Sequence, residues 1–514
     1  MAGQPYIPVI IIEQLAPLLI LLAGALGCLV ADAASNKAGS RRVLPFIAGA
    51  ALLAALATFF LPLWPANRPF LEGFLRVDRF GVLGSVTILF AMFVMTVLGP
   101  ETVRRRNLPS GEYYALILFA ALGMVTLSLA NELVTAFIAI EILSLSLYVL
   151  TGIDRRSARS TEGAFKYFVL GAFASAFFVM GMAFLYGATG STRLNDMAEV
   201  FRTGARPLLD GSTSPLNAVF AFMGFTLLFV GISFKLSLAP FHMWAPDVYQ
   251  GAPTTTTMAI ATASKIGVFA LLFHVIVTLA SWPPFYNAAA FLLTAVAAAS
   301  IVWGNVQALA QTNVKRMLAF SSIAHGGYVM VAYVALMSLP TASLEALSFQ
   351  QQEIAESILL YLFGYTLMNV LAFGLAHHLG KGGEGEMKNY RGLWKRSPMA
   401  ASGMALALFS LTGIPPTVGF IGKFYVFRHA IEQGQYGLAV IGVLASVISA
   451  FYYLRLVVTM FMTDEEAGAD AAQLAGGGDS AAVLAPGTLA LGVAAGMLLL
   501  FGVFPMIFFV LVRY

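Results

Sequence analysis

"GISFKLSLAPFHMWAPDVYQGAP", residues 231–253, places a lysine and a proline directly after a stretch of apolar residues. The preceding residues 216–230, "LNAVFAFMGFTLLFV", contain no charged side chain. Proline lacks a backbone N–H and its ring clashes with the preceding helical turn, so Pro240 interrupts a helix just after Lys235. The segment therefore predicts a broken helix with a buried lysine close to the break.

The composition of the chain indicates which solvent surrounds this helix. The chain has 514 residues, of which 59% are hydrophobic and 11% are charged, whereas soluble domains carry about a quarter charged residues. Apolar segments of about 20 residues, the length that crosses a bilayer as a helix, recur along the chain. We predict an all-α, polytopic membrane protein of about fourteen transmembrane helices, with cores at 9–31, 43–63, 80–99, 113–130, 132–152, 166–188, 216–239, 254–280, 288–309, 316–337, 354–378, 399–427, 436–462 and 486–512.

The regions between the apolar segments are short, and no domain linker stands out. We therefore expect one membrane domain, 1–514, and not separate domains. Residues 189–215 have room for a short surface helix around "LNDMAEVF", and the acidic, Gly/Ala-rich residues 463–485 favour a mobile loop.

Basic residues are scattered over loops and not gathered into a nucleic-acid-binding patch. Counted from the first helix, odd-numbered loops hold more Lys and Arg than even-numbered loops, for example Lys37, Arg41 and Arg42; Arg104, Arg105 and Arg106; Arg155, Arg156 and Arg159; and the basic residues of 381–396. The positive-inside rule then places odd loops in the cytoplasm and both termini on the non-cytoplasmic side. Cys28 is the single cysteine, which excludes disulfides and iron–sulfur ligation within the chain.

Four charged residues lie deep in apolar segments, where an isolated charge costs a few kcal/mol or more. They are Glu141, Lys235, Lys265 and Lys423. One interpretation is a set of static ion pairs that fix helix packing. However, three lysines and one carboxylate leave surplus positive charge, which favours a proton path. Desolvation favours the neutral form of lysine and a nearby carboxylate favours the charged form, so movement of Glu141 relative to Lys235 would load and unload a proton.

The twelfth apolar segment repeats the design of the seventh. Gly413, Pro415, Pro416 and Gly419 precede Lys423 and break its helix. Two interrupted helices five segments apart are typical of transporters built from inverted repeats. We predict two inverted five-helix repeats, formed by helices 4–8 and 9–13.

The remaining polar residues of the apolar segments are less specific. His325 and His242 are candidate proton relays. For His325 a hydrogen-bonded contact between helices accounts for the residue equally well, and His242 lies beside a loop, which favours the relay role less. The sequence leaves the role of His274 open. For Arg455, packing or topology is the favoured interpretation.

Five motifs carry a family resemblance: "FKLSLAPFHMWAPDVYQGAPT" (234–254), "ATASKIGVFALLF" (261–273), "KRMLAFSSIAHGGY" (315–328), "GIPPTVGFIGKFY" (413–425) and "EILSLSLYVL" (141–150). Together they resemble the antiporter-like membrane subunits of respiratory complex I, the proton-pumping NADH:quinone oxidoreductase. "WAPDVYQGAP" resembles subunit N, the counterpart of mitochondrial subunit 2, in particular.

This resemblance implies a fourteen-helix subunit with broken helices 7 and 12, in which Glu141, Lys235, Lys265 and Lys423 match the family's proton-translocating residues. It also implies a multi-pass position in the cell inner, energy-transducing membrane. The implied units are 1–112 (helices 1–3), 113–280 and 288–462 (the two repeats), and 463–514 (a loop and helix 14).

The resemblance further implies partners and cofactors. Other complex I membrane subunits and a quinone handled by the complex are the expected partners, and NADH, flavin and iron–sulfur clusters are expected in partner subunits. The chain itself has no phosphate-binding glycine loop and no Cys/His cluster, so we expect no cofactor, no metal and no redox site in it. Two alternatives stay open: a subunit of a multisubunit cation/proton antiporter, and a structural membrane subunit.

Overall fold

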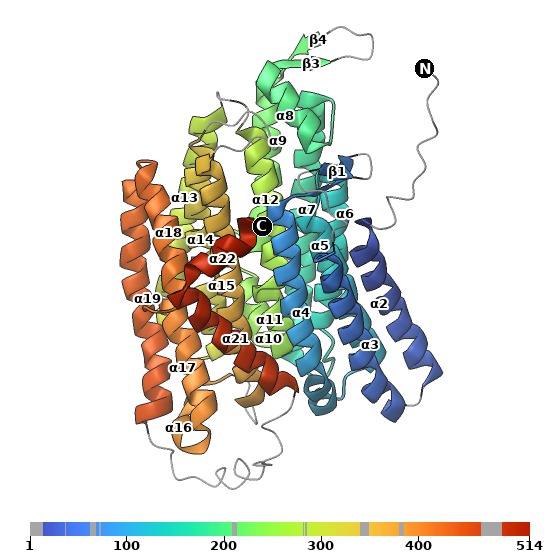
Figure 1. Ribbon diagram of the computed structural model, residues 1–514, viewed down its shortest axis with the longest axis vertical. Helices are drawn as coiled ribbons and strands as arrows, with labels where there is room; N and C mark the ends of the chain where they lie inside the picture. The colour runs from blue at the N-terminus through green and yellow to red at the C-terminus, as the bar shows by residue number, and fades with distance from the viewer. Residues whose placement is uncertain are drawn as a thin grey trace.

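A computed structural model describes residues 14–35, 37–61, 68–70, 73–207, 213–280, 282, 285–339, 349–379, 385–463 and 486–513. Long helices run side by side along the length of the molecule and form a bundle (Figure 1). Within the described residues, 12 helices are long and apolar enough to cross a membrane. The other two predicted segments correspond to the shorter apolar helices Arg42–Thr58 and Pro398–Thr412. Apart from Thr463, the predicted loop 463–485 lies outside the described residues.

The first part of the bundle consists of continuous helices. They are α2 (Ala16–Ala34), α3 (Lys37–Thr58), α4 (Arg79–Arg106), α5 (Ser110–Ser128), α6 (Leu133–Thr151) and α7 (Ala158–Thr189). Asp78 begins α4, where its carboxylate accepts a 2.7 Å hydrogen bond from the Gly81 amide. Glu132 begins α6 in the same way, because its carboxylate accepts from the Thr135 amide. Such caps satisfy amides that have no partner inside the helix.

The segment quoted at the start forms two helices separated by irregular backbone. α9 (Ala218–Leu236) ends one residue after Lys235, and α10 (Ala245–Gly251) resumes after the Ala239–Pro240 peptide bond, which is cis. Ser237 adopts a left-handed conformation with φ 57°, which closes the last turn of α9.

The predicted eighth helix, 254–280, is not continuous. It forms α11 (Thr254–Ala261) and α12 (Ala263–Leu279), separated by Thr262 with φ −115° and ψ −85°. No proline or glycine marks this break. The Thr262 hydroxyl donates to the Met258 carbonyl oxygen at 2.7 Å, and such a bond from a threonine back to the preceding turn bends helices.

The second part of the bundle contains the other broken helix. Its elements are α13 (Tyr286–Leu309), α14 (Val314–Met337), α15 (Phe349–Leu379), η3 (Met387–Tyr390), α16 (Leu393–Arg396), α17 (Pro398–Thr412), α18 (Val418–Glu432), α19 (Tyr436–Met462), α21 (Pro486–Val503) and α22 (Pro505–Arg513). The predicted last segment, 486–512, is therefore two helices, because Pro505 cannot continue the hydrogen-bonding pattern of α21. α21 crosses the front of the bundle obliquely, and α22 turns away from its end (Figure 1).

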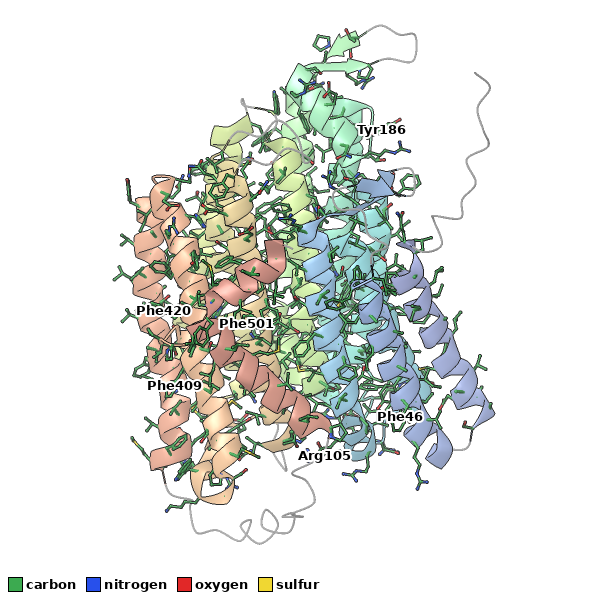
Figure 2. All side chains as sticks on the ribbon, viewed as in Figure 1. Phe46, Arg105, Tyr186, Phe409, Phe420 and Phe501 are labelled. Atoms are coloured by element: carbon green, nitrogen blue, oxygen red, sulfur yellow. The ribbon has the colours of Figure 1, made fainter. Side chains whose placement is uncertain are left out.

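The centre of the bundle is formed by α11, α12 and α14, whose apolar windows are 100% buried, whereas the window of α7 is 28% buried. Short elements gather at the upper end in Figure 1: α8 (Leu194–Thr203), and the hairpin of β3 (Ala205–Pro207) with β4 (Thr213–Pro215). A second antiparallel hairpin pairs β1 (Arg68–Phe70) with β2 (Leu75–Val77). The chain is thus mostly helical, and these two hairpins modify the all-α prediction. Arg105 lies at the opposite, lower end, as does α16 (Figures 1 and 2).

Candidate functional site: three buried lysines

Lys235 lies in an aromatic environment at the end of α9. Its ammonium nitrogen donates a 2.8 Å hydrogen bond to the Tyr148 hydroxyl on α6. The same nitrogen lies 4.9 Å from the ring centre of Tyr148, 5.5 Å from that of Tyr167 and 5.6 Å from that of Phe234. Aromatic faces attract a cation, most strongly where water is excluded. Lys235, only 5% exposed, is therefore held by one hydroxyl and three rings.

Glu141 lies two turns before Tyr148 on α6 and is not ion-paired with Lys235. Its carboxylate instead accepts a 2.5 Å hydrogen bond from the Ser175 hydroxyl on α7. Glu141 and the lysine are connected through α6, because Tyr148 on that helix holds the Lys235 ammonium. The static ion pair considered from the sequence is thus not formed between these two residues.

Lys265 connects three helices at the centre of the bundle. It lies in the first turn of α12, just after the break at Thr262, and its ammonium donates to the Ser322 carbonyl oxygen of α14 at 2.9 Å. The Ser322 hydroxyl is 3.1 Å from the Tyr249 hydroxyl of α10. α10, which continues the broken seventh helix, is therefore linked through Tyr249 to Ser322, the residue that binds Lys265.

His325 is flanked by tyrosine hydroxyls on both ring nitrogens. Nδ1 is 2.8 Å from the Tyr361 hydroxyl of α15, and Nε2 is 3.4 Å from the Tyr453 hydroxyl of α19. On α14, His325 follows Ser322, whose carbonyl oxygen accepts from Lys265, and its ring lies 5.6 Å from that of Tyr328, which faces Lys423. His325 therefore lies on α14 between the contacts of these two lysines.

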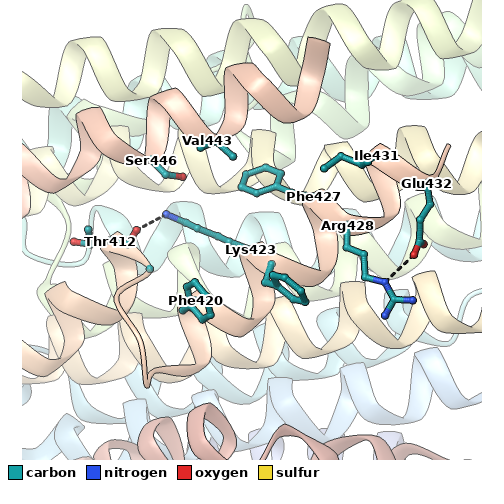
Figure 3. A pocket seen from close by; sticks show the side chains of 11 residues that line it. Thr412, Phe420, Lys423, Phe427, Arg428, Ile431, Glu432, Val443 and Ser446 are labelled. Atoms are coloured by element: carbon teal, nitrogen blue, oxygen red, sulfur yellow. Dashed lines mark hydrogen bonds and ion pairs between the residues drawn. The ribbon is translucent and has the colours of Figure 1, made fainter. Parts of the chain in front are cut away.

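Lys423 reaches back to the end of the helix segment that precedes it. Its ammonium donates to the carbonyl oxygens of Leu411 at 3.1 Å and Thr412 at 2.9 Å (Figure 3). These carbonyls lack intrahelical partners because α17 ends at Thr412. The ammonium also lies 4.8 Å from the ring centre of Tyr328. Gly413, at φ +92°, supplies the backbone conformation that ends α17, and a Cβ there would lie 3.1 Å from Lys423 Cδ.

A cavity of about 470 Å³ opens beside Lys423 between α18 and α19 (Figure 3). Its walls include Phe420, Phe424, Phe427 and Val443, and the Arg428–Glu432 ion pair lies at its far end. The cavity therefore extends from the buried ammonium toward charged groups at the end of α18.

Three other candidates from the sequence have different surroundings. His242, in the connection between α9 and α10, packs against Trp303 with ring centres 5.8 Å apart, and within the described residues it bonds to none of the three lysines. His274 bonds through Nε2 to Asp78 at 2.7 Å. Arg455 donates to the carbonyl oxygens of Leu309 and Gln311 and so closes the end of α13. In the described residues, no group of three or more His, Cys, Asp or Glu side chains is arranged to hold a metal.

The sequence interpretation did not identify the tyrosines that surround these cations. Tyr148, Tyr328, Tyr361 and Tyr453 are neutral and occur among many aromatic residues, so no charge marks them. The available signal is spacing: Ser144 and Tyr148 follow Glu141 at positions i+3 and i+7 and so share its helix face.

Comparison with known proteins places this site in a family. The model for "NADH:quinone oxidoreductase/Mrp antiporter, TM" matches residues 130–449. The NADH-quinone oxidoreductase subunit N of Chloroflexus aggregans is 37% identical over 494 residues, which is 95% of each chain. This chain belongs to the subunit N family. The resemblance to subunit N predicted from the sequence is thereby confirmed.

Two solved structures show how far the subunit N likeness extends. A chain of respiratory complex I from Thermus thermophilus with bound Aureothin matches with a TM-score of 0.75 and 31% identity, covering 95% of this chain and 97% of that chain. A chain of the Mrp complex from Dietzia matches with a TM-score of 0.76 and 17% identity, covering 96% and 95%. The Mrp match shows a shared fold alone, so the fold does not distinguish an antiporter subunit from subunit N. The sequence identity to subunit N relatives makes that distinction.

Proposed function

We propose that this chain is a proton-translocating membrane subunit of a complex I-type NADH:quinone oxidoreductase, with Glu141, Lys235, Lys265 and Lys423 as its proton carriers. One observation supports this assignment above others. The three lysines are 2% to 5% exposed, their ammonium groups bond to hydroxyl or carbonyl oxygens, and none forms an ion pair within the described residues. A permanently charged, unpaired group is costly in such a place, whereas a group that exchanges its proton is charged only for part of a cycle.

The contacts between the lysines suggest the order of transfer. Lys235 lies by Tyr167, which stacks on Trp244 at the start of α10, and Tyr249 of α10 bonds to Ser322, the partner of Lys265. Further along α14, the His325 ring lies beside Tyr328, whose ring faces the Lys423 ammonium. We place His325 in the path as a relay, and we assign His242 no contact with the lysines.

The same proposal includes the architecture predicted from the sequence: fourteen crossings, with inverted repeats at 113–280 and 288–462, flanked by 1–112 and 463–514. The two breaks, α9 to α10 and α17 to α18, each adjoin a buried lysine, which supports the repeat. Arg105 and α16 share one end of the bundle, which supports a cytoplasmic position for that end and non-cytoplasmic termini.

Redox chemistry belongs to other subunits in this proposal. NADH, flavin and iron–sulfur clusters would be held there, and quinone would be reduced by the complex as a whole. The chain would act only when assembled with the other membrane subunits in an energy-transducing membrane, because it moves protons in response to a reaction that it does not perform.

The test replaces each lysine by alanine in the assembled complex and measures NADH-driven proton uptake into membrane vesicles. Lys235→Ala should lower pumping about tenfold or more, because moving one charge against 100 mV takes about 2.3 kcal/mol and a missing carrier is not easily bypassed. Lys388→Ala, an exposed lysine of η3, is the matched control and should pump normally. Normal pumping by fully assembled Lys235→Ala, Lys265→Ala and Lys423→Ala complexes would refute the proposal.

A further inference from the structure

The hydrogen bond between Lys235 and Tyr148 joins the lysine to a polar face of α6. Glu141, Ser144 and Tyr148 lie on that face at helical spacing, over about 10 Å along the axis. Ser144 lies one turn after Glu141 and one turn before Tyr148, so its hydroxyl is the polar group between them on this face. This inference rests on the proposed function, because it concerns how Lys235 exchanges its proton.

Glycine at position 171 makes room for the Tyr148 hydroxyl. A Cβ built on Gly171 of α7 would overlap that hydroxyl oxygen and would lie 2.7 Å from the ring carbon that bears it. The Tyr148 ring itself is fixed by edge-on packing against Tyr167 and Phe168, with ring centres 4.5 Å and 5.9 Å apart. The hydroxyl is therefore directed toward Lys235 by its neighbours and is not free to turn aside.

A phenol hydroxyl is both an acceptor and a donor, so it can take a proton on one side while it gives its own proton on the other. When protonated Lys235 transfers a proton to the Tyr148 oxygen, the Tyr148 proton passes to the Ser144 oxygen and the Ser144 proton passes to the Glu141 carboxylate. The lysine becomes neutral, the carboxylate becomes a carboxylic acid, and both hydroxyls are restored. The reverse sequence reloads the lysine.

We propose that Tyr148 is a proton-relay residue between Glu141 and Lys235, and that Gly171 is a positioning residue that keeps the Tyr148 hydroxyl on this path. Ser144 completes the path on the same helix face. Its own hydroxyl bonds to the Ile140 carbonyl oxygen and must turn toward Glu141 for the transfer.

The deciding experiment compares Tyr148→Phe with Tyr333→Phe in the assembled complex. Both variants remove one buried phenol hydroxyl, but the Tyr333 hydroxyl donates to the Phe269 carbonyl oxygen and contacts no lysine of the path. Tyr148→Phe retains the ring over Lys235, so we expect normal assembly, with turnover lowered about tenfold by the lost charge-assisted bond. Protons pumped per NADH and the pH profile of turnover should also change. Tyr333→Phe should leave turnover, protons pumped per NADH and the pH profile unchanged.

Lys235→Ala, measured in parallel, separates this inference from the proposed function. If Lys235→Ala impairs pumping and Tyr148→Phe pumps normally with an unchanged pH profile, the relay is refuted and the lysine remains a carrier. If neither variant affects pumping, Lys235 is not a carrier, so the proposed function fails at this residue and the relay fails with it. A fall in turnover by Tyr148→Phe with unchanged stoichiometry and pH profile would assign Tyr148 a packing role and also overturn the relay.

Gly171→Ala tests the positioning role independently. If Gly171 acts through the Tyr148 hydroxyl, the effects of Gly171→Ala and Tyr148→Phe on turnover should not be additive in the double variant. Additive effects would overturn the positioning role. Should Gly171→Ala prevent assembly, the double variant with Tyr148→Phe should restore it, because the overlapping hydroxyl is then absent. Failure of the double variant to assemble would overturn the positioning role.

Discussion

Glu141 and Lys235 act on each other through space and through α6, not through an ion pair. We therefore expect Glu141 to act on Lys235 through its charge more than through its shape. Glu141→Gln should lower quinone-coupled turnover several-fold, by about 1 kcal/mol or more of barrier. Glu141→Asp keeps the charge and should retain most of the activity. The measurement is NADH:quinone turnover with proton pumping in vesicles.

Glu162→Gln is the control for this pair of variants. Glu162 is an exposed residue of α7 whose partner is Lys166, so loss of its charge should leave turnover unchanged. Equal loss of activity in Glu141→Gln and Glu141→Asp would instead assign Glu141 a steric role beside Ser175.

Sequence alone was informative for the charged residues of the site and uninformative for their partners. A lysine in an apolar segment is rare, so Lys235, Lys265 and Lys423 stand out without any structure. Their acceptors are a tyrosine hydroxyl and main-chain carbonyls, which occur throughout the chain and become special only when the fold brings them to a cation. For the same reason the path through Tyr148 could not be read from charge.

Among the helices, the end of α21 supports the break between α17 and α18. A Cβ on Gly502 would overlap the Pro416 carbonyl oxygen, so the last long helix approaches the break as closely as a glycine allows. Gly502→Ala should push this connection aside and displace Lys423. We expect a loss of about 1–3 kcal/mol of stability, as for other overpacked sites, together with reduced pumping.

Gly496→Ala is the matched control, because it lies on the same helix with nothing within 4 Å of a built Cβ. Alanine favours a helix over glycine by up to about 1 kcal/mol, so this variant should be neutral or slightly stabilising. Thermal unfolding of the purified complex and pumping in vesicles are the two measurements. If the two variants behave alike, the contact between Gly502 and the break has no energetic role.

Hydropathy predicted the ends of the continuous helices. It did not predict the places where a local hydrogen bond or a proline interrupts a helix. The segment predicted at 436–462 coincides with α19, because one apolar stretch is bounded by polar residues on both sides. The interruption at Thr262 could not be predicted, because a threonine hydroxyl bends a helix in some contexts and not in others. The break at Pro505 was missed because hydropathy is averaged over a window, and one proline hardly changes that average.

The orientation of the whole molecule can be tested with its single cysteine. Cys28 is buried, so introduced cysteines at exposed positions should be the reactive ones. Arg156→Cys, in a basic loop, should react with a membrane-impermeant maleimide only from the cytoplasmic side. Glu199→Cys, on α8 at the other end, should react only from the opposite side. Labelling of intact cells and of inverted vesicles makes the measurement, with the unmodified chain as control.

Labelling of both positions from the same side would contradict the proposed topology, because Arg156 and α8 belong to opposite ends of the bundle.

The fold class followed from composition and segment length, since a chain this apolar has few alternatives to a helical membrane domain. The arrangement of the helices did not follow, because nothing in the hydropathy of α11, α12 or α14 marks them as the described helices whose apolar windows are entirely buried.

The two lysines beside the helix breaks differ in the kind of oxygen that holds them. An amide carbonyl accepts a hydrogen bond but does not become protonated near neutral pH, so the Leu411 and Thr412 oxygens can hold the Lys423 ammonium without taking a proton from it. Two of its three N–H bonds therefore point to oxygens that do not take up a proton. Proton exchange at Lys423 in this arrangement therefore uses the remaining N–H bond, whereas the hydroxyl bonded to Lys235 can itself accept and donate a proton. The two helix breaks thus provide lysine sites of different kinds: main-chain oxygens hold the ammonium at one, and a hydroxyl can pass a proton on at the other.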